Sequence, residues 1–225
     1  MRIVAVADTH LFHRGLTVPA GDVFVHAGDM CRRGEDLGEL RDTADWIQAL
    51  PHRTKIVVAG NHDRMFADRP EEARAVLAER GIRYLEDGGT EVDGVTFWGS
   101  PWQPEYEGWA FNLPRGRALA ERWALIPEGV DVLVTHGPPL GIGDRTAPPE
   151  RRGCEDLLAR VRRVRPRLHL FGHIHQDGGL WRHGGTTFAN VTTWECERAP
   201  TVVRLTPAEV TGEVVPPARA ARDAS

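Results

Sequence analysis

The sequence has little cysteine, a single lysine and no long apolar run. Its three cysteines, Cys31, Cys154 and Cys196, are odd in number and far apart, which argues against a disulfide framework and suits a reducing compartment. The first apolar stretch is interrupted at Asp8, so it is too short for the core of a signal peptide or for a membrane span. We therefore expect a cytoplasmic protein without a membrane partner.

A surplus of basic charge is also missing. The formal net charge is -4 at pH 7, so the surface lacks the positive charge with which proteins neutralise a nucleic-acid backbone. Long nucleic acid is therefore not an expected partner. A small phosphate ester remains compatible with this charge, because two divalent cations at one site outweigh a modest negative charge spread over the surface.

Strand-length apolar runs alternate with helical patterns along most of the chain. The runs cover residues 2–7, 22–27, 55–59, 95–98, 131–135 and 167–171. The helical patterns cover residues 35–50, 70–80, 115–124 and 154–163. This alternation predicts an α/β layered domain. The first three runs are continuously apolar, which indicates a sheet that is covered on both faces.

The last part of the chain follows a different pattern. The expected strands at residues 186–189 and 201–205 have no helix between them, so we expect them to pair antiparallel and the sheets to be mixed. We assign residues 1–206 to a single domain. Residues 207–225 are rich in Pro, Ala and Arg and are predicted to form a flexible tail.

Polar motifs follow five of the expected strands. They are Asp8-Thr9-His10, Gly28-Asp29, Gly60-Asn61-His62-Asp63, His136-Gly137-Pro138 and Gly172-His173-Ile174-His175. Ligands of α/β folds gather at the carboxyl ends of strands, so we expect the five loops to converge on one crevice. Each motif alone could be ordinary turn or capping chemistry. Their succession, each after a strand, favours a shared functional site.

The residue types in these motifs indicate a hydrolytic metal site. Carboxylate, imidazole and amide oxygen without thiolate suit Mn²⁺, Fe or Zn²⁺ and argue against a cysteine-type structural zinc. The alternation of Asp8 with His10, and of His173 with His175, can aim both members of a pair at one crevice if the backbone is extended. Two ions about 3.5–4 Å apart can share a carboxylate. Asp29 is the candidate for this bridge.

The motif series Asp-x-His, Gly-Asp, Gly-Asn-His-Asp, His-Gly and Gly-His-x-His resembles the calcineurin-like metallophosphoesterases over roughly residues 3–190. The segments 99–102, 109–111 and 135–141 resemble the small metallophosphoesterase-domain proteins related to class III cyclic nucleotide phosphodiesterases. This resemblance implies a four-layer α/β/β/α sandwich, in which two mixed sheets pack face to face with helices outside.

The resemblance also implies two divalent metal ions, for which Mn²⁺ is favoured over Fe or Zn²⁺. One ion would be held by Asp8, His10, Asp29 and His175, and the other by Asp29, Asn61, His136 and His173. In the family mechanism a metal-bridging hydroxide attacks phosphorus in line. His62 would then protonate the leaving alkoxide or stabilise the phosphate, and Asp63 would orient a neighbouring imidazole.

The function that follows is hydrolysis of a phosphodiester, such as a cyclic nucleotide or a similar small ester. A phosphomonoesterase or protein phosphatase, and a non-catalytic binding module on the same fold, are the alternatives. The aromatic segment from Trp98 to Phe111 would either pack in the core or stack against a nucleobase. Histidines without a motif partner are predicted to be surface or satisfied polar residues: His13, His26, His52, His169 and His183.

Overall fold

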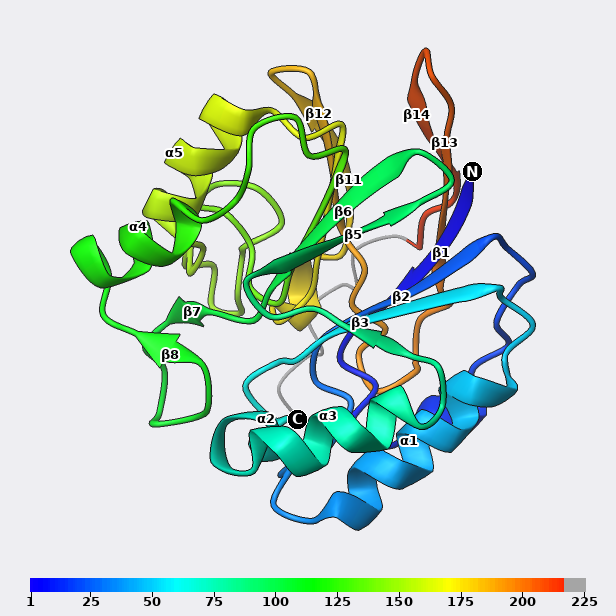
Figure 1. The fold of residues 1–225 in the computed structure, drawn as a ribbon. Helices are drawn as coiled ribbons and strands as arrows, with labels where there is room; N and C mark the ends of the chain where they lie inside the picture. Colours follow the sequence, from blue (N-terminus) through cyan, green and yellow to red (C-terminus); the bar gives the residue numbers. More distant parts are fainter. Residues whose placement is uncertain (217–225) are drawn as a thin grey trace.

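The computed structural model describes residues 1–216, which form two six-stranded sheets (Figure 1). The first sheet contains β1 (Arg2–Val6), β2 (Val23–Ala27), β3 (Thr54–Val58), β4 (Arg83–Tyr84), β13 (Thr201–Leu205) and β14 (Val210–Val214). The second contains β5 (Gly88–Val92), β6 (Val95–Ser100), β9 (Val132–Thr135), β10 (Leu168–Phe171), β11 (Gly179–His183) and β12 (Thr186–Asn190). The short strands β7 (Gln103–Pro104) and β8 (Asn112–Leu113) pair with each other outside both sheets.

Both sheets are mixed, as predicted. The first has the order β14-β13-β1-β2-β3-β4, in which β1 to β4 run parallel and β13 and β14 are antiparallel to their neighbours. The second has the order β11-β12-β10-β9-β6-β5, with a parallel centre and an antiparallel strand at each edge. Every strand expected from the sequence forms, with boundaries shifted by at most two residues.

The expected pairing of residues 186–189 with 201–205 is wrong. Strand β12 pairs parallel with β10 in the second sheet, whereas β13 pairs antiparallel with β1 in the first. The chain crosses between the sheets after β12, where Val191 N–H donates to Phe171 C=O and Val191 C=O accepts from Ala7 N–H. The two consecutive strands therefore belong to different sheets.

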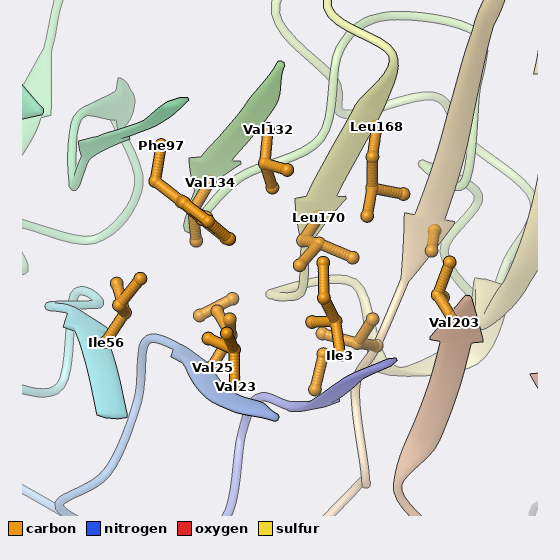
Figure 2. Packing of buried hydrophobic residues seen from close by; sticks show 14 of the residues in the cluster. Ile3, Val23, Val25, Ile56, Phe97, Val132, Val134, Leu168, Leu170 and Val203 are labelled. Atoms are coloured by element: carbon orange, nitrogen blue, oxygen red, sulfur yellow. The ribbon is translucent and has the colours of Figure 1, made fainter. Parts of the chain in front are cut away.

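The core between the sheets consists of aliphatic side chains and one phenylalanine. Figure 2 shows side chains of the first sheet facing those of the second across this layer. The labelled residues are Ile3, Val23, Val25, Ile56 and Val203 on one side and Phe97, Val132, Val134, Leu168 and Leu170 on the other. Burial of each such side chain contributes about 1.5–3 kcal/mol, so this layer holds the two sheets face to face.

Helices cover the outer faces and complete the predicted α/β/β/α order (Figure 1). Helices α1 (Leu37–Ala49), α2 (Met65–Asp68) and α3 (Pro70–Ala78) pack on the first sheet. Helices α4 (Arg117–Trp123) and α5 (Glu155–Val164) pack on the second. The continuously apolar strands β1 to β3 are therefore buried on both faces. Among residues 1–216, no helix is both long and apolar enough to cross a membrane.

The predicted tail is partly incorrect. Val210–Val214 form strand β14, which pairs antiparallel with β13. Val210 is buried in the core between the sheets, and Glu213 forms ion pairs with Arg2 and Arg204. These contacts order a segment whose composition alone suggested a tail. The prediction for residues 217–225 lies outside the described residues.

Candidate metal centre

The five polar loops meet at one end of the sandwich. They follow β1, β2 and β3 of the first sheet and β9 and β10 of the second. Hydrogen bonds join the two sheets here, because His173 N–H lies 3.1 Å from both carboxylate oxygens of Asp8. Within the second sheet, Gly172 N–H donates to His136 C=O at 2.9 Å, which joins the loops after β9 and β10. The convergence expected from the strand ends is therefore present.

One group of possible ligands combines Asp8, His10 and His175. Their ligating atoms all lie within 4.8 Å of one another. His175 Nε2 is 3.7 Å from Asp8 Oδ1. His10 Nδ1 donates to Cys31 C=O at 3.1 Å, since a carbonyl can only accept. That bond leaves His10 Nε2 available for a cation, which is the arrangement that metal-binding histidines require.

A second group combines Asp29, His136 and His173, again with ligating atoms within 4.8 Å. His136 Nδ1 donates to Ala27 C=O at 2.9 Å, which directs His136 Nε2 into the centre. That nitrogen lies 3.0 Å from Asn61 Oδ1, so the amide oxygen joins this group. The structure thus brings all seven residues predicted as metal ligands together at this end of the sandwich.

Asp29 lies between the two groups. Its Oδ2 is 3.8 Å from His10 Nε2 of the first group and 3.4 Å from His136 Nε2 of the second. Its other oxygen, Oδ1, accepts a hydrogen bond of 2.8 Å from His62 N–H. One carboxylate oxygen therefore faces both groups while the other is held by the backbone. This is the geometry of a ligand that two cations can share.

The left-handed backbone of the loops differs from the extended conformation that was expected. Asp8, His10, Asp29 and His173 have φ values of 57°, 42°, 58° and 68°. Left-handed backbone costs about 1–2 kcal/mol for a residue with a Cβ, and such strain gathers at functional sites. Asp8 and His10 therefore both reach the centre through a turn, rather than through the alternation of a strand.

Glycines allow the loops to approach closely. A Cβ on Gly60 would lie 2.2 Å from Asp29 Oδ1, and one on Gly28 would lie 2.3 Å from His136 Nδ1. Neither distance is possible without displacing a predicted metal ligand. The two glycines that precede Asn61 and Asp29 are therefore required by the packing of the centre.

Asp63 has a different role from the one expected. Its carboxylate accepts hydrogen bonds from the backbone N–H groups of Asp29, Met30, Cys31 and Gly60. The partners are backbone amides rather than an imidazole, because the fully buried carboxylate lies beneath the loops after β2 and β3. Asp63 thus joins these two loops and fixes the backbone that carries Asp29.

His62 lies at the rim of the centre. Its Nδ1 donates to Arg32 C=O at 2.5 Å, which leaves Nε2 without a proton in the neutral ring and free to exchange one. Its ring stacks on Trp109, with centroids 4.1 Å apart and planes at 28°. It also meets His10 edge to face at 4.7 Å. His10, Asp29 and His62 form a third possible ligand group, so His62 is within reach of a bound cation.

The electrostatics of the centre favour cations. Burial alone would raise the pKa of Asp8, but the neighbouring His175 holds it below the usual range of an aspartate. Burial alone would lower the pKa of His136, but the Asp29 carboxylate outweighs this effect and raises the pKa to about 9. Burial lowers the pKa of His173 to about 3, so this imidazole is neutral. The ionised carboxylates of Asp8 and Asp29 thus lie near the neutral imidazole of His173.

A cavity of about 490 Å³ opens beside this centre. His173 and His175 form one wall, while Tyr106, Arg115 and Arg152 are among the residues that line the rest. The residues of the aromatic segment considered in the sequence therefore lie in different environments. Phe111 is buried in the core, Tyr106 lines the cavity and Trp109 stacks on His62. The sequence did not reveal the Trp109 contact, which joins residues 47 positions apart.

Within residues 1–216, the histidines without a motif partner belong to none of the possible ligand groups. His183 is exposed, whereas His13, His26, His52 and His169 are buried. His26 and His169 each share a hydrogen bond of 2.9 Å with a threonine hydroxyl. His13 Nε2 lies 3.4 Å from a carboxylate oxygen of Asp42.

Comparison with known proteins agrees with this geometry. A family model described as calcineurin-like phosphoesterase matches residues 1–177. The human metallophosphoesterase domain-containing protein 1 is 44% identical over 214 residues, which cover 85% of this chain and 65% of that protein. A UPF0046 protein of Caenorhabditis elegans, C25E10.12, is 39% identical, and the match covers 84% of this chain and 74% of that protein. The chain therefore spans slightly less than two thirds of the length of the human relative.

Solved structures share the fold at low sequence identity. The protein TT1561 of Thermus thermophilus superposes with a TM-score of 0.65 at 15% identity, over 94% of this chain and 97% of that chain. The phosphopantetheinyl hydrolase of Mycobacterium tuberculosis superposes with a TM-score of 0.57 at 17% identity, over 84% of this chain and 88% of that chain.

Proposed function

The chain belongs to the calcineurin-like phosphoesterase family, and from this premise we propose that it is a dinuclear metal-dependent hydrolase of small phosphodiesters. Family membership indicates a hydrolase that uses divalent metal ions. The observation that carries the more specific proposal is the position of Asp29 Oδ2 between His10 and His136. A single metal site would not need one carboxylate oxygen to face two separate groups of ligands.

The donor set fits two divalent cations. Asp8, His10, Asp29 and His175 would hold one ion, and Asp29, Asn61, His136 and His173 the other. Oxygen and imidazole donors without thiolate suit Mn²⁺, Fe and Zn²⁺, and we propose Mn²⁺. Bound ions would acidify a water molecule and offset the negative charge that develops on the phosphate oxygens.

The protein's own residues orient these groups. Two backbone carbonyls fix the tautomers of His10 and His136, and Asp63 holds the backbone of Asp29. His62 would deliver a proton to the leaving alkoxide from Nε2, while Arg32 C=O holds the proton on Nδ1. General acid catalysis of this kind contributes about 10²–10⁴-fold in rate.

The proposed substrate is a diester rather than a monoester. A monoester carries an additional negative charge, which a cation near the metal ions would have to neutralise. Arg14 and Arg64, which follow two of the site loops, pair with Asp42 and Asp68. In the cavity wall Arg152 pairs with Glu150, and the Arg115 guanidinium donates to the carbonyls of Gly153 and Arg152. The adjoining cavity has the volume of typical small-ligand pockets, about 300–1,000 Å³. It could hold the organic group of a nucleotide-sized ester.

The cysteines support a reducing compartment for this activity. Cys31, Cys154 and Cys196 are free thiols, and the first two are buried. We therefore propose the cytoplasm as the location of the enzyme.

Hydrolysis of bis-(4-nitrophenyl) phosphate by chelator-treated protein, with and without added Mn²⁺, tests this function. We expect turnover that depends on Mn²⁺ and that Asp29→Ala abolishes. Asp68→Ala serves as the control, since this exposed carboxylate pairs with Arg64 away from the centre. Absence of turnover with any divalent ion, in a protein that binds those ions, would instead favour a non-catalytic binding module.

A further inference from the structure

The segment between β7 and β8 places the indole of Trp109 against His62, at the rim of the metal centre. The indole itself has no part in the proposed hydrolysis. We propose that Trp109, in this segment, is a positioning residue that holds the imidazole of His62 in the orientation needed for general acid catalysis. This inference rests on the proposed function, because it assigns a role to His62 in ester cleavage.

Three contacts define the orientation of the His62 ring. Arg32 C=O accepts from Nδ1, His10 meets the ring edge to face, and Trp109 covers one face of the ring. A single hydrogen bond at Nδ1 selects a tautomer but still allows the ring to pivot about that bond. The stacked indole, 4.1 Å away and tilted by 28°, blocks this rotation. Trp109 therefore fixes the direction in which Nε2 points.

The carbonyl that accepts from His62 is itself held in place. The N–H groups of Arg32, Arg33 and Gly34 all donate to the carboxylate of Glu39, at 3.1–3.2 Å. This carboxylate fixes the turn that presents Arg32 C=O. The hydrogen bond at Nδ1 and the indole thus act on the imidazole from two independently ordered segments.

The segment that carries Trp109 is tied to the same loop as His62. Ala110 N–H donates to Asn61 C=O at 3.3 Å, directly beside His62. The Asn112 amide donates to Tyr106 C=O at 2.7 Å and accepts from Gln103 Nε2 at 3.1 Å, which closes the turn. Ala110 is also buried against the core that covers the first sheet. The backbone next to Trp109 is therefore hydrogen-bonded to the backbone next to His62.

The turn between β7 and β8 contains two residues in the left-handed backbone conformation, which indicates that its shape is constrained. Glu107 and Phe111 have φ values of 47° and 55°, in the region that favours glycine. Residues with a Cβ adopt this region at an energetic cost that surrounding contacts must offset. In this turn the conformation allows Trp109 to reach over His62.

Loss of the indole should affect only the protonation of the leaving group. None of the seven proposed metal ligands stacks on Trp109 or bonds to its side chain within residues 1–216, so both cations should remain bound. A good leaving group such as 4-nitrophenolate departs with little help from an acid, whereas a phenolate without the nitro group needs a proton. The consequence of misaligning His62 should therefore grow as the leaving group becomes more basic.

The kinetic test compares Trp109→Ala and Trp109→Phe with wild type on aryl phosphodiesters of increasing leaving-group basicity. We expect Trp109→Ala to reduce kcat about tenfold more for the most basic leaving group than for 4-nitrophenolate, in the manner of His62→Asn. Trp109→Phe retains a flat ring and should restore most of the activity. An equal loss for all leaving groups would overturn the positioning role.

The spectroscopic test follows the His62 ring directly. In Zn²⁺-loaded protein labelled with ¹⁵N-histidine, wild-type His62 should show a protonated, slowly exchanging Nδ1, assigned with His62→Asn. Trp109→Ala should produce faster exchange and a mixture of tautomers, while Trp109→Phe should resemble wild type. Glu107→Gln is the control in the same turn, since the Glu107 side chain is exposed and is not part of the cavity lining, and it should leave the His62 signal unchanged. An unchanged His62 signal in Trp109→Ala would contradict the proposal.

The two measurements separate this inference from the proposed function. If the wild-type protein does not hydrolyse phosphodiesters, the function fails, but the ¹⁵N spectra still report whether Trp109 orients His62. If Trp109→Ala does not fold, Trp109→Leu keeps the bulk of the side chain without a flat face. Its spectrum should still differ from that of Trp109→Phe.

Discussion

Asp29 Oδ2 lies 3.8 Å from His10 Nε2 and 3.4 Å from His136 Nε2, and the two histidines follow strands of different sheets. Asp29 and His10 belong to the loops of the first sheet, whereas His136 follows β9 of the second. A cation bound beside this carboxylate would therefore link the two halves of the sandwich.

Removal of metal should lower the thermal stability of the protein. A metal ion at a free concentration of 100 times its Kd adds about 2.7 kcal/mol to the free energy of unfolding for one site. Since each kcal/mol shifts Tm by about 2–4 °C in a domain of this size, one occupied site should raise Tm by about 5–10 °C. Thermal unfolding of chelator-treated protein, with and without Mn²⁺, measures this shift. Asp29→Ala should lose most of it, whereas a full shift in Asp29→Ala would argue against the shared carboxylate.

Metal binding should release a proton and strengthen as the pH rises. In the metal-free protein Asp29 raises the pKa of His136 from 6.5 to about 9, so the imidazole is charged at pH 7 and must lose its proton to bind a cation. Affinity should thus increase by about tenfold per pH unit up to about pH 9, as expected for one displaced proton. Calorimetry in buffers of different ionisation enthalpy counts this proton. A pH-independent affinity between pH 6 and 8 would contradict the assignment.

The same pKa has a consequence for the metal-free fold. Because the folded-state pKa of His136 is raised, its pairing with Asp29 stabilises the protein fully below about pH 6.5. That contribution is lost as the pH rises through about 9.

Asp63→Asn should weaken metal binding although Asp63 contacts no cation. The amide supplies one acceptor oxygen in place of two, so backbone N–H groups beneath Asp29 lose their partners, at about 1–3 kcal/mol each. We expect lower stability and a loss of about 10–100-fold in metal affinity, as for other residues that orient ligands. Asp144→Asn is the matched control, since Asp144 is also buried and accepts from the backbone of Gly141 and Gly153. It should lose stability but keep its affinity for metal.

Gly60→Ala should disrupt the centre by direct contact. The added methyl group would lie 2.2 Å from Asp29 Oδ1, so the carboxylate must move, and we expect about tenfold weaker metal binding or more. Gly94→Ala is the comparison, because Gly94 has a φ of 77° and open space around its Cα. That change should strain the backbone by about 1–2 kcal/mol without affecting metal titrations. Equal affinities in the two variants would contradict the packing described for the centre.

The layered fold and the convergence of the polar motifs could be predicted from the sequence. The continuous Val and Ile runs of β1 to β3 identify buried parallel strands, and the carboxyl ends of such strands meet at one edge. The edge strands were harder to recognise. β5, with the sequence GGTEV, and β11, with GLWRH, contain glycine and charged residues, and their partners rather than their composition determine their structure.

The details of the site depend on tertiary contacts that no local pattern contains. The left-handed backbone at Asp8 and His173 is stabilised by bonds between loops of different sheets. Three of the four backbone partners of the Asp63 carboxylate lie more than 30 positions away in the sequence, so the adjacent His62 did not reveal them. The stacking of Trp109 on His62 depends on the course of the turn after β7.

The most direct test of the dinuclear centre is the electron paramagnetic resonance spectrum of protein loaded with Mn²⁺, together with its metal content. The account predicts two ions per chain and an exchange-coupled spectrum, because one carboxylate oxygen of Asp29 faces both ligand groups. Asp29→Ala should lose the coupling. A single ion per chain, or two ions whose spectrum is that of isolated Mn²⁺, would contradict the shared carboxylate.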